Sequence, residues 1–153
     1  MTRMFKTIAA ATAAAGTLDI LSAFLWNGGK VVRVLNSVAR GPFGDRFGGL
    51  AGAAIGLAVH FAIMTVMAAA LVLAMSRVAA LRRHAWIVGI GYGLILYGVM
   101  YGIVLPLRWP SAFPQTDPVD IAKALVSHIL CVGLPLALIA RRMLEGVRGP
   151  PSP

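Results

Sequence analysis

The chain has 153 residues, of which 59% are hydrophobic and only 12% are charged. Soluble domains usually have about 25% charged residues, so this composition excludes an ordinary soluble protein and indicates an integral membrane protein. The net charge is +9, but the Lys and Arg residues lie between apolar runs and form no continuous basic face. This pattern excludes nucleic acid as the partner and favours the anionic headgroups of a lipid bilayer.

Four apolar runs reach the length of about 20 residues that a helix needs to cross a bilayer. They cover residues 7–26, 50–75, 86–107 and 119–140. We therefore predict an all-α, four-transmembrane-helix bundle that forms a single domain over residues 1–148. The Pro-rich end of the chain, residues 149–153, is predicted to be a disordered tail.

The first apolar run has two interpretations. Arg3 and Lys6 ahead of an alanine-rich stretch are also typical of a secretory signal peptide. The apolar run continues to Leu25, well beyond any small-residue cleavage site, which favours an uncleaved membrane span.

The first connection is predicted to contain an amphipathic helix over residues 30–40. Val31, Leu35 and Val38 recur at helical spacing on one face. The opposite face is polar and basic, with Lys30, Arg33, Ser37 and Arg40. Such a helix is expected to lie in the plane of the lipid headgroups and to end at the Gly-Pro pair of residues 41–42.

The third connection is proline-rich and leads into the last span. Asp117 is suited to cap a helix, Pro118 to occupy its first position, and Asp120 to face the positive end of the helix dipole. The fourth helix is therefore expected to begin at Pro118.

Four spans place both termini on the same side of the membrane. That side has eight basic residues: Arg3, Lys6, Arg77, Arg82, Arg83, Arg141, Arg142 and Arg148. The other side has six: Lys30, Arg33, Arg40, Arg46, Arg108 and Lys123. The positive-inside rule then predicts that both termini are cytoplasmic.

Three ionisable side chains lie within the predicted spans: Asp19, His60 and His128. Such groups are costly in a bilayer and therefore indicate a functional site. At 1.5 Å per residue their levels agree within roughly 5 Å, and Tyr97 and Tyr101 of the third span lie near the same level. We expect these five residues to form a buried polar cluster.

Small residues predict which helix faces meet, because they let membrane helices approach closely. Gly48, Gly52 and Gly56 follow one another at four-residue spacing, and His60 is the next step on that stripe. Pro135 is expected to kink the fourth helix beside His128, because it cannot donate to the carbonyl four residues earlier.

An Asp with two His side chains has several interpretations. It can be a proton-responsive cluster linked to proton or small-solute passage, a carboxylate–imidazole site for zinc or iron, or a pair of haem ligands at His60 and His128. It can also be a purely structural hydrogen-bonded group. No nucleotide-binding loop, serine elbow or metalloprotease helix is present, so we expect no enzyme and no cofactor. Four short spans also predict a homo-oligomer if a transport path exists.

Several segments together resemble a known pattern: GTLDILSAFLWNGG at 16–29, RVLNSVARGPFG at 33–44, LAVHF at 57–61 and SHILCVGLPLALIARR at 127–142. They resemble a family of small, uncharacterised bacterial four-helix membrane proteins, and more remotely the YagU family of inner-membrane proteins. The matching positions are Gly16, Asp19, His60, His128, Gly133, Pro135 and the Arg141-Arg142 pair. The resemblance implies a bacterial inner-membrane location and no particular activity.

Overall fold

The computed structural model describes residues 2–145, and every regular element in this range is a helix. Four helical stretches are long and apolar enough to cross a membrane: Arg3–Trp26, Gly49–Arg77, Ala85–Arg108 and Pro118–Glu145. The predicted all-α class and the four long apolar helices are confirmed. The predicted tail at 149–153 lies outside the described residues.

The first two spans are single helices, whereas the last two are each divided by a π-helical segment. The first half of the chain forms α1 (Thr2–Trp26), α2 (Val31–Phe43), the 3₁₀ turn η1 (Gly44–Arg46), α3 (Gly49–Arg77) and α4 (Ala79–Arg83). The third span consists of α5 (Ala85–Val99), the π-helix η2 (Met100–Val104) and α6 (Leu105–Arg108). The fourth consists of α7 (Pro118–Val126), the π-helix η3 (Ser127–Gly133) and α8 (Leu134–Glu145).

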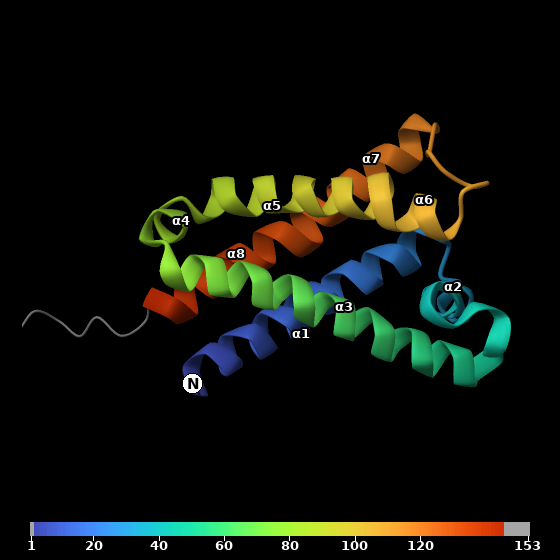
Figure 1. Ribbon diagram of the computed structural model, residues 1–153, viewed down its shortest axis with the longest axis horizontal. Coiled ribbons are helices and arrows are strands. Elements are labelled where there is room, and N and C mark those ends of the chain that lie inside the picture. The colour runs from blue at the N-terminus through green and yellow to red at the C-terminus, as the bar shows by residue number, and fades with distance from the viewer. Residues whose placement is uncertain (1, 146–153) are drawn as a thin grey trace, which may run out of the picture.

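The spans run up and down, so that their connections gather at two ends of the molecule (Figure 1). The start of α1, the short α4 and the end of α8 lie at one end, where the Arg3 Nε donates to the Met143 carbonyl (2.7 Å). The helix α2, the end of α6 and the start of α7 lie at the other end. We call these the α4 end and the α2 end.

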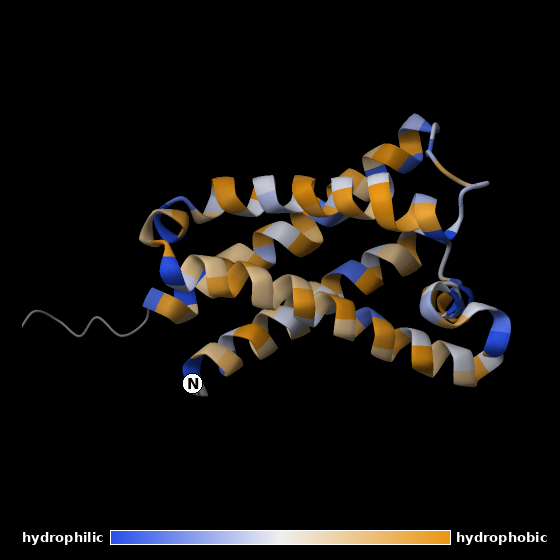
Figure 2. Cartoon of the chain, in the orientation of Figure 1, coloured by the Kyte–Doolittle hydropathy of each residue, from blue (hydrophilic) through white to orange (hydrophobic). Residues whose placement is uncertain are grey.

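The core lies where α1, α3 and α8 meet. It is built largely from small residues and flexible methionines, including Ala11, Ala15, Met64, Ala68, Val72, Met75, Leu136 and Ala137. Large apolar side chains on the outer faces remain exposed, for example Leu25 (76%), Val66 (71%) and Ile87 (70%). The spans are apolar along most of their length, whereas hydrophilic residues concentrate near the two ends (Figure 2). Exposed apolar surface of this extent is what a lipid-facing helix presents.

The helix α2 differs from the predicted interfacial helix in its end and in its buried face. It continues through Pro42 to Phe43, and Gly44 with φ 62° follows it. A proline in the last turn costs one hydrogen bond. Arg108 donates to the Gly41 and Arg40 carbonyls of this turn, and the Arg40 carbonyl also accepts the Gly44 N–H. The buried side chains are Val34, Leu35 and Ala39, whereas Val31 of the predicted apolar face is exposed.

The predicted glycine stripe of α3 packs against α2 and not against another membrane span. A Cβ on Gly56 would overlap the Leu35 carbonyl, and a Cβ on Gly52 would overlap the Asn36 side chain. A Cβ on Gly48 would meet nothing within 4 Å, so this glycine takes no part in the contact. The absence of side chains at Gly52 and Gly56 therefore explains which face α2 buries.

Each π-helical segment ends next to a proline. The Leu134 N–H, just before Pro135, donates to the carbonyl of Ile129 five residues earlier. The Leu105 N–H, just before Pro106, donates in the same way to Met100. The proline ring cannot follow an ordinary α-helical turn without a clash, and a widened turn removes that clash. The predicted irregularity at Pro135 thus takes the form of a π-helix.

The helix α7 begins as predicted. The Asp117 carboxylate accepts hydrogen bonds from the backbone N–H groups of Val119 (2.7 Å) and Asp120 (3.2 Å), and Pro118 is the first helical residue. We expect Asp117→Ala to lower the free energy of unfolding by about 1 kcal/mol, because two helix N–H groups lose their acceptor. Unfolding in mixed detergent micelles, followed by circular dichroism, measures this loss. Unchanged stability, equal to that of an Asp45→Ala control, would contradict the capping role.

Candidate functional site

Asp19 and His60 meet where α1 crosses α3. The His60 Nε2 lies 2.9 Å from the carbonyl oxygen of Gly16, and the Nδ1 lies 4.0 Å from the Asp19 carboxylate. The His60 side chain is 9% exposed and that of Asp19 is 24% exposed. Gly16 permits this close crossing, because a Cβ at that position would lie 2.7 Å from the Phe61 ring.

The geometry of His60 determines where its protons are. A carbonyl oxygen can only accept a hydrogen bond, so the Nε2 must hold a hydrogen and donate it to Gly16. In a neutral ring the Nδ1 is then an acceptor, and its lone pair faces the Asp19 carboxylate. The 4.0 Å separation is too long for a hydrogen bond, so the Nδ1 and the Asp19 carboxylate are neighbours across a short gap.

His128 lies on the π-helix η3 and faces the aromatic side of α5 and η2. Its Nδ1 donates to the Ala124 carbonyl one turn earlier (2.9 Å), which leaves the Nε2 of the neutral ring as an acceptor. Tyr97 and Tyr101 stack with their ring centroids 4.9 Å apart. The imidazole meets both rings edge-on, at 6.0 Å from Tyr97 and 5.7 Å from Tyr101.

Glycines hold η3 against α5 at backbone distance. A Cβ on Gly93 would lie 2.5 Å from the His128 carbonyl oxygen and 2.8 Å from the Ile129 Cα. A Cβ on Gly133 would overlap the Gly89 carbonyl and lie 2.7 Å from the Gly93 nitrogen. This contact brings His128 into reach of the tyrosines one and two turns further along the third span.

A polar cavity of about 310 Å³ lies between α1, η2, α7 and η3. Its wall includes Asp19, Tyr101 and His128 among the predicted site residues. The remaining lining residues are Ser22, Ala23, Trp26, Asn27, Gln115, Asp120, Lys123, Ala124 and Ser127. Asn27 and Gln115 belong to connections at the α2 end, so the cavity extends from Asp19 towards that end. Asp120 and Lys123 form an ion pair in its wall (3.0 Å).

The wall of the cavity contains a hydrogen-bonded chain that the sequence analysis missed. The Trp26 indole donates to the Ser127 hydroxyl (2.9 Å), which lies 3.0 Å from the Ser22 hydroxyl. The Ser22 hydroxyl in turn donates to the Asp19 carbonyl (2.8 Å). Each hydroxyl has one hydrogen, so all three bonds form together when Ser127 donates to Ser22. The spacing Asp19–Ser22–Trp26 places these side chains on one helix face and was the available signal.

The five predicted site residues thus lie in one region of the molecule, but they do not all contact one another or line the same cavity. Asp19 is the common member, because it faces His60 on one side and lines the cavity together with His128 and Tyr101 on the other. His60 lies behind Asp19 at the crossing of α1 and α3. Tyr97 contacts His128 and Tyr101 without lining the cavity.

The metal and haem hypotheses find no support in this geometry. Among residues 2–145 there is no group of three His, Cys, Asp or Glu side chains placed to hold a metal ion. The His60 Nε2 is directed at the Gly16 carbonyl and the His128 Nδ1 at the Ala124 carbonyl. A haem ligand at His60 would have to displace the contact between α1 and α3.

Comparisons with protein-family models, curated proteins and solved structures found no match for this chain. The candidate site is therefore described by its own chemistry: a buried histidine beside a carboxylate, a polar cavity that extends towards one end of the helices, and a second histidine against two tyrosines.

Proposed function

We propose that this chain is a non-enzymatic, multi-pass protein of the bacterial inner membrane that passes protons, and that the Asp19–His60 pair binds them. The observation that supports the proposal is the His60 ring, whose Nε2 donates to Gly16 while its Nδ1 lies 4.0 Å from Asp19. A carboxylate and an imidazole that lie together beside a polar cavity can accept a proton from that cavity and release it again.

The surroundings of the pair fit an alternating path. Towards the α2 end, the Asp19 carboxylate reaches the polar cavity. Towards the α4 end, Ala11, Ala15, Met64 and Ala68 are packed and almost fully buried. Protons therefore enter from the α2 end in this conformation, and release to the other side requires α1 to move against α3.

Membrane and orientation follow from two separate arguments. The resemblance to small bacterial inner-membrane proteins and to the YagU family supports the location. The excess of basic residues near the α4 end supports cytoplasmic termini, so the cavity would open away from the cytoplasm. Because four spans enclose little space, we further propose that the working unit is a homo-oligomer.

Proteoliposomes that contain a pH-sensitive dye test the proposal. With valinomycin and a potassium gradient as the driving force, the wild-type protein should change the internal pH faster than protein-free liposomes. Asp19→Asn should reduce the rate to that of protein-free liposomes, because Asn cannot take up a proton. Asp45→Asn is the matched control, since Asp45 lies on the surface in an ion pair with Arg40.

A histidine pair completes the design. His60→Gln should abolish the flux, whereas His84→Gln should preserve it, because His84 is exposed at the start of α5. Wild-type flux equal to that of protein-free liposomes, or full flux in Asp19→Asn, would overturn the proposal.

A small polar solute is a second candidate cargo. The observation that favours it is the cavity itself, which at about 310 Å³ matches the lower end of ligand pockets and is lined by hydroxyl, amide and indole groups. Swelling of proteoliposomes in glycerol and in urea, followed by light scattering, tests it. Accelerated swelling that Ser127→Phe removes would support solute passage, and swelling equal to that of protein-free liposomes would exclude these solutes.

A further inference from the structure

A second hollow at the α2 end differs from the polar cavity in its lining and its position. It has a volume of about 620 Å³ and lies between α2, α3, the η2–α6 segment and the turn after Arg108. Val38 and Pro42 line it from α2, Ile63 from α3, and Met100 and Val104 from the third span. We propose that this groove binds one anionic phospholipid, with an acyl chain along the apolar lining and the phosphate at Arg108.

The lining is suited to an acyl chain and not to a polar ligand. Apart from Ser37 and Arg108, the side chains around the groove are apolar or aromatic. The groove begins beside the interfacial helix α2 and extends along the third span towards Met100, two turns further in. It therefore connects the headgroup level with the apolar interior of a bilayer, which is the path that an acyl chain follows.

Arg108 supplies a charge that has no acidic partner within residues 2–145. Arg40 is paired with Asp45 (3.0 Å), whereas no carboxylate among residues 2–145 forms an ion pair with Arg108. The Arg108 Nε donates to the Gly41 carbonyl (2.7 Å) and the Nη2 to the Arg40 carbonyl (3.0 Å). A guanidinium has five N–H groups, so three remain for a phosphate.

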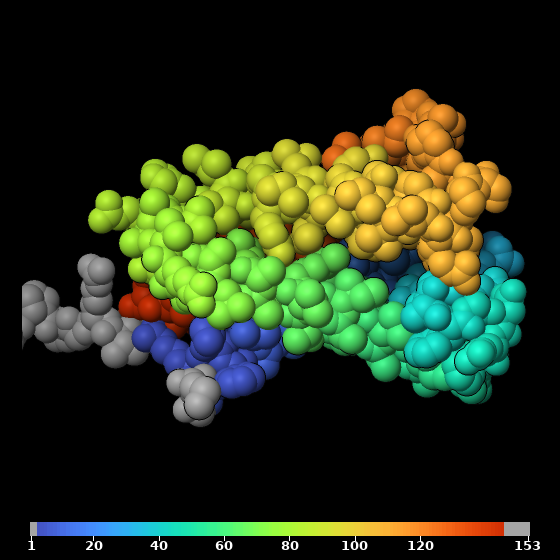
Figure 3. Space-filling view, in the orientation of Figure 1, coloured from blue at the N-terminus to red at the C-terminus, as the bar shows by residue number. Residues whose placement is uncertain are grey.

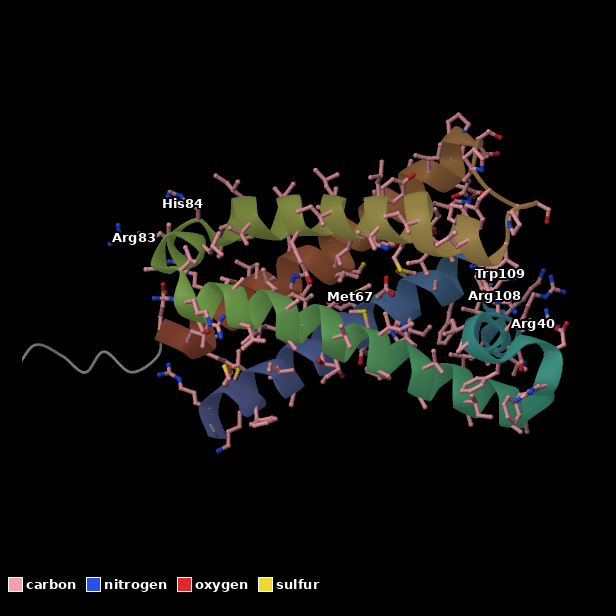
Figure 4. All side chains as sticks on the ribbon, in the orientation of Figure 1. Arg40, Met67, Arg83, His84, Arg108 and Trp109 are labelled. Carbon is pink, nitrogen blue, oxygen red and sulfur yellow. The ribbon has the colours of Figure 1, made fainter. Side chains whose placement is uncertain are left out.

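The same contacts hold the guanidinium in place at the rim. Two backbone carbonyls of α2 fix its plane, and it lies 5.6 Å from the centre of the Trp109 ring. Figure 4 shows Arg108 and Trp109 together beside α2, at the same end as Arg40. Figure 3 shows the surface of α2 meeting that of the α6 region there. An arginine fixed in this way loses little freedom when it binds a phosphate, and an adjacent tryptophan is typical of the headgroup level.

Native mass spectrometry of the full-length protein tests the proposal. The protein is purified in detergent and mixed with equal amounts of phosphatidylglycerol and phosphatidylcholine that have the same acyl chains. We expect one retained lipid per chain and a preference of about fivefold for phosphatidylglycerol, as one arginine at the headgroup level provides. Arg108→Gln should remove the preference and Arg108→Lys should keep part of it. Arg46→Gln, which removes an exposed charge at the same end, should leave it unchanged.

Arg108 also supports the end of α2, so its substitutions could act through the fold. A second pair of variants therefore tests the groove by blocking it with a larger side chain. Ala112 lines the groove and Ser111 does not, although both belong to the exposed turn after Trp109. Ala112→Phe should prevent retention of phosphatidylglycerol, whereas Ser111→Phe should permit it. Equal retention of the two lipids by the wild-type protein, or full retention by Ala112→Phe, would overturn the proposal. Asp19→Asn should retain the lipid, so failure of the proton hypothesis would not affect this result.

Discussion

Replacing His60 with Ala is expected to lower the free energy of unfolding by about 3 kcal/mol. The substitution removes the donor that the Gly16 carbonyl needs, leaves Asp19 without its partner, and opens a void where α1 crosses α3. Reversible unfolding in mixed detergent micelles measures the loss. His84→Ala, at an exposed position, should change the stability by less than about 0.5 kcal/mol.

A double-mutant cycle with Asp19→Asn separates the interaction between Asp19 and His60 from the packing contribution of the His60 ring. An Asn side chain at position 19 can donate to the Nδ1 of a neutral His60, so Asp19→Asn alone should cost little stability. In that background His60→Ala should cost about 1–2 kcal/mol less than in the wild-type chain, because no carboxylate loses its partner. Strictly additive effects would show that Asp19 and His60 do not interact.

The same cycle has a spectroscopic counterpart. Under the proposed proton uptake, ¹⁵N resonances of the His60 ring should shift with pH while the Nε2 keeps its hydrogen. In Asp19→Asn the Nε2 should keep its hydrogen, because the Gly16 carbonyl still accepts it. A His60 ring protonated only on the Nδ1 would contradict the tautomer that the Gly16 contact requires.

Gly133→Ala is expected to destabilise the protein by about 1–3 kcal/mol, because the new methyl group has no space. Its Cβ would overlap the Gly89 carbonyl, and the Gly93 nitrogen would lie only 2.7 Å away. Both neighbours are backbone atoms of α5, so relief requires η3 and α5 to separate. That separation would also move His128 away from Tyr97 and Tyr101, and the expected loss of stability is measured by unfolding in mixed micelles.

Gly98→Ala, on α5 of the third span, is the matched control. A Cβ at Gly98 would meet nothing within 4 Å, and Ala is the better helix former. The control should leave the stability unchanged or raise it by up to about 1 kcal/mol. Equal effects of Gly133→Ala and Gly98→Ala would show that the contact between η3 and α5 does not depend on its glycines.

The amino-acid sequence by itself determined the class of this protein and its four long apolar helices. Run length and hydropathy are properties of neighbouring residues, and the bounds of the four helices follow them closely. The start of α7 at Pro118 was equally predictable, because Asp117 caps the helix through atoms two and three residues away. The irregularity before Pro135 was also visible, since a proline affects its own turn.

Only the tertiary structure decided which groups meet. The buried face of α2 depends on its contact with Gly52 and Gly56. The helical periodicity therefore predicted that Val31 is buried, whereas in the structure Val34 and Ala39 are buried. The π-helix η3 interrupts the fourth span between α7 and α8, and a regular helical wheel does not include the offset that it introduces. The chain from Trp26 through Ser127 to Ser22 joins residues 101 and 105 positions apart. Such pairs follow from how the helices rotate against one another, and helix rotation is set by contacts between distant segments rather than by local pattern.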